Sequence, residues 1–182
     1  FIDEGGFLSS MDQPAEVSVL EQGPLFVKVA VRGKIGKFPF TQTIRLTQGE
    51  PRIDMSVKLD WIGSPRIGEP GIEFRADNPR KAFYDDRYKL LVYLPTQIAN
   101  QQIYKDAPFD VCESRLENTF FNRWDSIKHN IILNWVDVAS KDNSCGLSLF
   151  TDHTTSYAHG KDFPLALNVQ YAGKGLWGRD YI

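Results

Sequence analysis

Residues 152–160 bring together side chains that could bind a metal ion. Asp152, His153 and His159 are all residue types that ligate transition metals. However, a gap of six positions between the two histidines fits neither a helical His-Glu-x-x-His face nor one short turn, and a structural zinc site needs four ligands. We therefore predict no metal site and interpret the stretch as a polar strand–turn–strand edge. The third histidine, His129, is predicted to lie in a solvated loop.

Pairs of carboxylates catalyse glycosidic hydrolysis, because one protonates the leaving oxygen while the other attacks or activates water. The sequence has adjacent acids at Asp85 and Asp86, directly before Arg87. Neighbouring residues of a strand point to opposite faces, so this pair cannot easily flank one bond and is interpreted as a charged turn. Asp54 and Asp60 lie apart on the polar face of one predicted strand and are typical of solvated cross-strand partners.

Motifs for a nucleophilic serine and for a phosphate-binding P-loop are missing from the sequence. It contains no Gly-x-Ser-x-Gly elbow and no P-loop. The two cysteines, Cys112 and Cys145, lack a nearby basic cluster or helix start that would lower a thiol pKa. They could form one disulfide, with buried free thiols as the alternative. We predict that the chain has no complete catalytic site of its own.

Two loops carry the residue types that recognise sugars. Aromatic rings stack on the C–H faces of sugars, while amide, guanidinium and carboxylate groups bind the hydroxyls. The candidate sugar contacts are Asn122, Arg123, Trp124 and Asp125 in one loop and Trp177 and Arg179 in the other. Loops carry binding residues more often than the strands that support them. The alternative is that Trp124 and Trp177 cap the ends of the hydrophobic core.

The elements that would position these loops are β-strands. Residues 52–61 alternate strictly between polar and apolar types, which predicts a strand with one wet face and one buried face. The residues predicted to be buried are Ile53, Met55, Val57, Leu59 and Trp61. Similar alternation in residues 16–19, 27–32 and 40–47, with short Gly/Pro turns between the runs, predicts an antiparallel meander.

The rest of the chain also favours strands. Residues 62–86 are interrupted by Gly and Pro and are predicted to form a long loop or insertion. Tyr88–Leu94 is apolar on both sides, so it is predicted to be a central strand. Further strands are predicted within residues 100–112, 131–139, 146–151 and 165–171, with a turn at 142–144. Because no helical period or internal repeat appears, we predict an all-β sandwich comprising a single domain, residues 1–182.

The composition excludes several classes of partner. The net charge is −2 and no run of Lys and Arg occurs, so neither nucleic acid nor an anionic membrane surface is an expected partner. No apolar stretch is long enough for a transmembrane helix, and the first residues lack the features of a signal peptide. The chain is expected to be soluble. Because the sequence begins without Met, we expect a fragment of a longer protein.

Several of the predicted strands together resemble the C-terminal β-sandwich region of the glycoside hydrolase family 38 α-mannosidases. The segments that carry this resemblance are Gln42–Leu46, Pro51–Asp54, Leu59–Trp61, Tyr88–Pro95, Trp135–Val138 and Gly146–Asp152. Their order and spacing agree over roughly residues 15–172. The Gly/Pro-rich stretch at 62–86 is longer than the family pattern at that point.

The resemblance implies an antiparallel β-supersandwich of the galactose mutarotase-like type, present here as a truncated fragment. It also implies that the parent protein hydrolyses α-mannosidic bonds with zinc ligands and an Asp nucleophile in a separate N-terminal domain. No residue of this chain matches those motifs, so no cofactor is expected here and the zinc is expected in the parent's catalytic domain. The implied partners are that catalytic domain and mannose-containing glycans.

Three hypotheses about function follow. The first is an accessory domain that supports the catalytic domain, in which case an exposed apolar patch is expected where that domain docks. The second is a free-standing carbohydrate-binding module, which would bind sugar by itself through the two aromatic loops. The third is a mutarotase-like enzyme, which would need a histidine and a carboxylate converging on one concave face.

Overall fold

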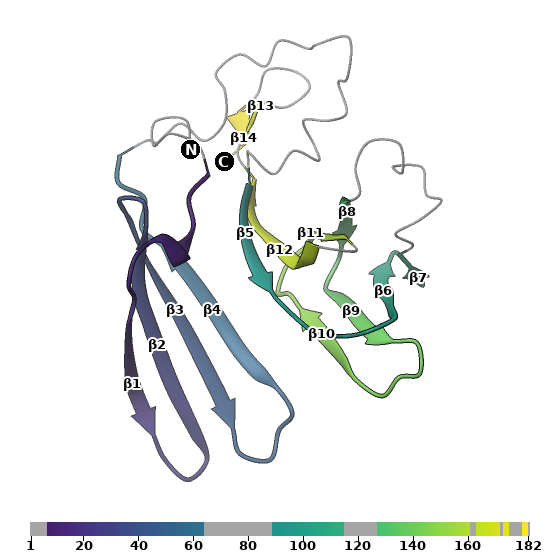
Figure 1. The fold of residues 1–182 in the computed structure, drawn as a ribbon, viewed down its shortest axis with the longest axis horizontal. Helices are drawn as coiled ribbons and strands as arrows, with labels where there is room; N and C mark the ends of the chain where they lie inside the picture. Colours follow the sequence, from purple (N-terminus) through teal and green to yellow (C-terminus); the bar gives the residue numbers. More distant parts are fainter. Residues whose placement is uncertain are drawn as a thin grey trace. The chain divides into compact units, whose positions relative to one another are not determined.

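The computed structural model describes residues 7–63, 89–114, 127–160, 163–171, 173–174 and 180–181. Every strand pair among them is antiparallel, and the helical content of these residues is one short 3-10 turn, η2 (Ser10–Asp12). The predicted all-β fold is therefore confirmed (Figure 1). The chain separates into two compact units, Phe1–Pro70 and Gly71–Ile182. A single domain over the whole chain stays a prediction.

The first unit is a four-stranded antiparallel meander, as the alternation predicted (Figure 1). Its strands are β1 (Glu16–Gln22), β2 (Phe26–Ile35), β3 (Phe38–Thr47) and β4 (Ile53–Leu59). The turn between β2 and β3 uses Gly36 at a φ of 60°, a left-handed conformation that glycine adopts without a steric penalty. At the outer edge of the sheet, the pairing of β1 with β2 shifts register between Val19 and Glu21, which places a bulge in β1.

One face of this sheet is apolar across all four strands. Val19 is paired with Val29, Val29 with Ile44, and Ile44 with Met55, so these side chains share one face. The apolar face defined by this register consists of Val17, Val19, Val27, Val29, Val31, Ile44, Leu46, Ile53, Met55 and Val57. Gln22, paired with Val27, and Gln42 also lie on this face, and Gln42 Nε2 donates to Met55 Sδ at 3.0 Å. The opposite face carries polar and charged side chains.

The prediction that the apolar residues of β4 are buried was wrong for three of them, while Leu59 is half-buried. Ile53, Met55 and Val57 are 62%, 43% and 40% exposed, because no described residue of the first unit covers the apolar face. Burial in this unit is found instead toward the β2–β3 hairpin, where Phe38 is fully buried and Trp61 packs edge-on against it with ring centroids 5.1 Å apart. Alternation therefore identified the apolar face but not whether anything covers it.

The described residues of the second unit form two four-stranded sheets and a two-stranded pair. The first sheet has the order β10-β9-β6-β7 and the second the order β5-β12-β11-β8, while β13 pairs with β14 (Figure 1). The strands are β5 (Lys89–Leu94), β6 (Gln101–Ala107), β7 (Asp110–Glu113), β8 (Ile127–Ile132), β9 (Trp135–Ser140), β10 (Gly146–Phe150), β11 (Thr155–Gly160), β12 (Phe163–Tyr171), β13 (Gly173–Lys174) and β14 (Asp180–Tyr181).

A single hydrophobic core joins the two larger sheets of the second unit. The first sheet contributes Ile103, Val136 and Val138, and the second contributes Ile132, Tyr157 and Leu165. All six are at most 2% exposed. Two sheets that bury their inner faces against one another form a β-sandwich.

Three predictions for this unit need correction. Among the described strands, β5 lies at the edge of its sheet and not in the centre. Apolar residues on both sides of a strand indicate that both of its faces are covered, but they do not indicate that a strand pairs with each of its edges. The predicted strand at 131–139 is two strands, β8 and β9, separated by a turn at Leu133–Asn134. His129 lies in the edge strand β8, where it pairs with Ala158, and not in a loop.

Candidate functional site

The sequence predictions for sugar binding fall on residues outside the described part of the chain. These residues are Asn122, Arg123, Trp124, Asp125, Trp177 and Arg179. Asp85 and Asp86, and most of the Gly/Pro-rich stretch 62–86, also lie outside it. The six sugar contacts therefore stay predictions.

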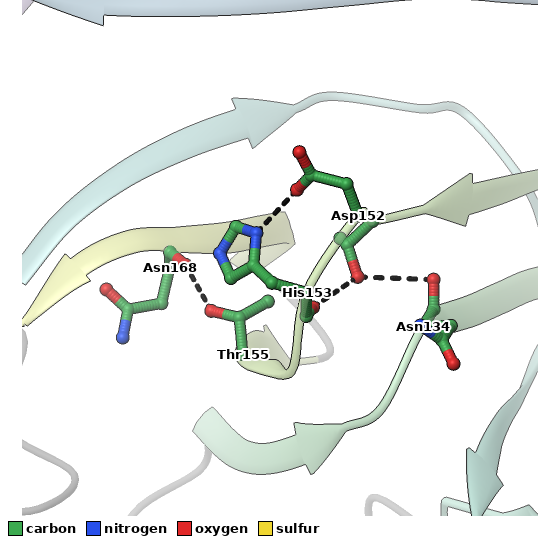
Figure 2. Close-up of polar contacts among 6 residues, drawn as sticks. Asn134, Asp152, His153, Thr155 and Asn168 are labelled. Atoms are coloured by element: carbon green, nitrogen blue, oxygen red, sulfur yellow. Dashed lines mark hydrogen bonds and ion pairs between the residues drawn. The ribbon is translucent and has the colours of Figure 1, made fainter.

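The turn between β10 and β11 holds the exposed pair Asp152 and His153 (Figure 2). His153 Nδ1 lies 2.5 Å from Asp152 Oδ1, and this hydrogen bond is the main reason that the pKa of the Asp152 carboxyl is lowered. The turn is fixed by Thr151, whose hydroxyl donates to the carbonyl oxygens of Asn134 at 3.2 Å and His153 at 2.9 Å. The two side chains are 95% and 61% exposed, so water screens their interaction.

His159 lies in a different environment from His153, which corrects the prediction of a polar edge around both. It is 3% exposed on β11, an inner strand between β12 and β8. Its Nε2 lies 2.5 Å from Gln101 Oε1, and the Gln101 Nε2 donates to the Ile98 carbonyl oxygen at 2.9 Å. Because the amide oxygen is the acceptor, His159 Nε2 carries the proton. This contact joins β11 of one sheet to β6 of the other.

The described residues contain no group of three or more His, Cys, Asp or Glu side chains that could hold a metal ion. His153 meets a carboxylate in an exposed turn, whereas the Nε2 of the buried His159 meets a neutral amide. The mutarotase-like hypothesis requires a histidine and a carboxylate that converge on one concave face, and the contacts described for His153 and His159 do not by themselves form such a pair.

Lys105 and Asp106 on β6 hold the neighbouring β8–β9 segment in place. Lys105 Nζ donates to the Ile131 carbonyl oxygen at 2.8 Å. Burial lowers the pKa of Lys105, although the nearby Cys112 and Asp106 act in the opposite direction. The Asp106 carboxylate accepts hydrogen bonds from the backbone nitrogens of Leu133 and Asn134. Both side chains bind backbone groups of this segment, so each has a structural role.

The β9–β10 turn at residues 142–144 is as predicted, and it is held by a network of hydroxyl groups. Asp142 Oδ1 accepts from the backbone nitrogen of Ser144 at 3.1 Å and from its hydroxyl at 2.9 Å. The hydroxyl of Ser140, with these two Ser144 groups, lowers the pKa of Asp142 to about 2. Cys145 follows this turn and is exposed, whereas Cys112 is half-buried on β7, and both are free thiols.

The apolar face of the β1–β4 sheet is not covered by the described residues of the first unit. Val17, Val19 and Ile53 are 67%, 60% and 62% exposed. A soluble domain seldom leaves such a contiguous apolar surface in water unless the surface binds a partner. The apolar face is therefore the candidate interface of the first unit. No helix among these residues is long and apolar enough to cross a membrane.

An apolar sheet face is typical of a surface that packs against another layer of protein. The chain matches the family model of the glycosyl hydrolases family 38 C-terminal domain over residues 5–168. It belongs to this family, and the resemblance inferred from the strand motifs is confirmed. Comparison with curated proteins gave no match, and comparison with solved structures gave none either.

Proposed function

We propose that the chain is the non-catalytic C-terminal region of a zinc-dependent α-mannosidase and that it supports the catalytic domain of the same parent protein. Membership of the family 38 C-terminal domains supports the glycosidase context. The observation that carries the supporting role is the exposed apolar face of β1–β4. On this proposal the zinc and the nucleophile belong to the catalytic domain, and mannose-containing glycans are its substrates.

The proposed occupant of the apolar face is the catalytic domain. The face carries these ten apolar residues together with Gln22 and Gln42, but no charged side chain, so its partner must present a similarly uncharged surface. Burying a single exposed Ile or Met in such an interface contributes about 1.5–3 kcal/mol. Docking would therefore stabilise the whole protein and hold the two domains in a fixed orientation. In that orientation this chain could contribute to the edge of the glycan site of the catalytic domain.

The alternative, a free-standing carbohydrate-binding module, depends on aromatic loops that lie outside the described residues. It makes a different prediction, because a module binds mannose as an isolated chain and a supporting domain does not. Titration of the isolated chain with mannose, followed by calorimetry, distinguishes the two proposals. Saturable binding would favour the module.

A pair of matched lysine substitutions in the full-length protein tests the supporting role. Ile53 and Ser56 are both exposed on β4 but lie on opposite faces of the sheet. Ile53→Lys is expected to lower both the melting temperature of the full-length protein and its hydrolysis of a chromogenic α-mannoside. Ser56→Lys, on the polar face, is expected to change neither. Equal behaviour of the two variants would contradict the proposal.

A further inference from the structure

The β9–β10 turn contains an asparagine whose side chain can react with the backbone of the next residue. Asn143 lies in this turn and is exposed, and Ser144 follows it. When a small residue follows an asparagine, the backbone nitrogen of that residue can attack the side-chain Cγ. A Cγ–N bond forms, the Cγ–Nδ2 bond breaks, and the side-chain nitrogen leaves as ammonia with the proton of the attacking N–H. Water then opens the resulting succinimide ring to aspartate or isoaspartate.

Position 143 has the most favourable sequence context for this reaction in the chain. The residues that follow the other asparagines are Pro79, Gln101, Thr119, Arg123, Ile131, Trp135 and Val169. Pro79 has no N–H to lose, and the others carry larger side chains than serine, which hinder ring closure. The sequence contains no Asn-Gly pair. Asn143 and Ser144 are therefore the pair with the least steric hindrance.

Asn100 provides an internal comparison, since its backbone resembles that of Asn143. Both residues are exposed, and both have a positive φ, 48° at Asn100 and 56° at Asn143. Short polar side chains tolerate this left-handed conformation. Because Asn100 is followed by Gln101, ring closure there meets a longer side chain. The two positions therefore differ mainly in the residue that supplies the attacking nitrogen.

In the folded turn, the attacking nitrogen is bound by two acceptors. The backbone nitrogen of Ser144 donates to Ser140 Oγ and to Asp142 Oδ1, both at 3.1 Å. Attack requires this N–H to lose its proton, which leaves negative charge on the nitrogen. Hydrogen bonds from Ser140 and Ser144 lower the pKa of Asp142 to about 2, so its carboxylate is charged at neutral pH and repels that charge. The folded turn therefore suppresses the reaction.

The same turn also holds the reacting groups in place. Ser140 is 7% exposed, and its hydroxyl also accepts the backbone nitrogen of Cys145 at 3.2 Å. The backbone of Ser140 binds the backbones of Cys145 and Asn143 through hydrogen bonds of 2.9 Å. Gln102 Nε2 donates to the side-chain oxygen of Asn143 at 3.0 Å. Ring closure moves the Ser144 nitrogen onto Cγ of Asn143 and away from its acceptors, so the turn must open first.

We propose that Asn143 is a site of spontaneous conversion to aspartate and isoaspartate, and that the hydrogen bonds of Ser140 and Asp142 set its rate. The reaction proceeds when the β9–β10 turn opens locally and exposes the Ser144 N–H to water. Water is the only co-reactant, and no partner molecule is needed. The inference is therefore independent of the proposed supporting function.

The product changes the turn in two ways. Conversion of the amide to a carboxylate places a further negative charge beside Asp142, which disfavours the ionised form of that residue. Isoaspartate also adds a carbon atom to the backbone between β9 and β10, close to the first residue pair of these strands, Ala139 with Gly146. Both changes weaken the turn that restrains the reaction in the unmodified chain.

Ageing experiments with peptide mapping test the proposal. The full-length protein and a synthetic peptide with residues 140–146 are incubated at mildly alkaline pH under reducing conditions, and mass spectrometry measures the conversion of Asn143 in each. The ratio of the two rates measures the protection that the fold provides. Asn143 is expected to convert more slowly in the protein than in the peptide, but faster than Asn100 in the same protein. Equal rates in protein and peptide, or faster conversion of Asn100, would overturn the proposal.

Two substitutions test the control of the rate by the turn. Ser140→Ala and Asp142→Ala each remove an acceptor of the Ser144 N–H, and each variant is compared with a peptide that carries the same substitution. The loss of hydrogen bonds that close the turn is expected to lower the protection about 2- to 10-fold. Ser148→Ala is the matched control, because it removes a hydroxyl of β10 that binds Asp137 and not the turn. Its protection is expected to equal that of the unsubstituted protein.

Asp142→Ala keeps the test decisive if the buried Ser140 is required for folding, since Asp142 is exposed on the turn. Circular dichroism verifies the fold of each variant before ageing. Unchanged protection in folded Asp142→Ala contradicts control by the turn, and so does an equal loss of protection in Ser148→Ala.

Discussion

The carboxylate of Asp106 on β6 lies 2.6 Å from the backbone nitrogen of Asn134, 28 positions further along the chain. The other carboxylate oxygen accepts the backbone nitrogen of Leu133 at 2.9 Å. One side chain therefore satisfies two consecutive donors in the turn that connects β8 to β9. Since β8 and β9 belong to different sheets, this interaction fixes the point at which the chain passes from one sheet of the sandwich to the other.

Substitution of Asp106 is expected to destabilise the second unit. Asp106→Ala leaves two backbone donors without their acceptor, and the expected loss is about 1–3 kcal/mol in the free energy of unfolding. Asp110→Ala is the matched control, because the Oδ1 of Asp110 accepts only the backbone nitrogen of the next residue. Chemical denaturation of both variants measures the difference, and a loss no larger for Asp106→Ala than for Asp110→Ala would contradict the structural role.

Gly33 on β2 is expected to tolerate no side chain, because the ring of Phe40 occupies the space beside it. A Cβ at Gly33 would lie 2.7 Å from Phe40 Cε1 and 3.3 Å from Ala15 Cβ. Phe40 is 8% exposed and cannot move freely, so Gly33→Ala is expected to lower the free energy of unfolding by about 1–3 kcal/mol.

The control for this substitution is Gly23→Ala. Nothing lies within 4 Å of a Cβ at Gly23, and alanine reduces the entropy of the unfolded chain. Gly23→Ala is therefore expected to leave the free energy of unfolding unchanged or to raise it by up to about 1 kcal/mol. Thermal and chemical unfolding measure both variants, and a neutral Gly33→Ala would show that the ring of Phe40 can move aside.

The β9–β10 turn should make stability depend on pH in the acidic range. The pKa of Asp142 is lowered from 3.8 to about 2, so the folded state favours the carboxylate. The stabilisation is fully present above pH 3.8 and is lost as the pH falls toward about 2. Asp142→Asn is expected to weaken this dependence, which unfolding midpoints measured across that range will show. An unchanged dependence in the variant would assign it to other carboxylates.

The apolar face should cause the isolated chain to self-associate. Exposed apolar surface on a sheet face promotes association when its natural cover is absent. Val19→Lys with Ile53→Lys places charges on β1 and β4, and this double variant is expected to sediment as a monomer at concentrations where the unsubstituted chain forms larger species. Analytical ultracentrifugation measures the effect. A lysine at Ser56, on the polar face, should leave the association unchanged.

Much of the fold could be predicted from local patterns. The alternation of Ile53, Met55 and Val57 with polar residues correctly identified β4 and its apolar face. The Gly and Pro residues between the alternating runs correctly predicted the turns of the meander. However, alternation of polar and apolar residues does not indicate what covers the apolar face of the sheet. For the same reason, the apolar run in β5 did not reveal that this strand lies at a sheet edge, since sheet order depends on contacts between distant segments.

The candidate sites were harder to predict. His153 and His159 are close in sequence, but one is exposed in a turn and the other is buried between two sheets, because the chain enters β11 at Thr155. The partner of His159, Gln101, is 58 positions away and has no local signal.

The bulge in β1 limits how the first unit can meet other molecules. A regular edge strand offers its backbone to an incoming strand, and sheets can then grow by addition from one molecule to the next. The shift between Val19 and Glu21 interrupts the regular spacing of donors and acceptors along β1. Association through that edge is therefore disfavoured, so the sheet contacts other molecules through its side chains. Such a contact is complete when one partner has bound, and it does not extend into a fibre.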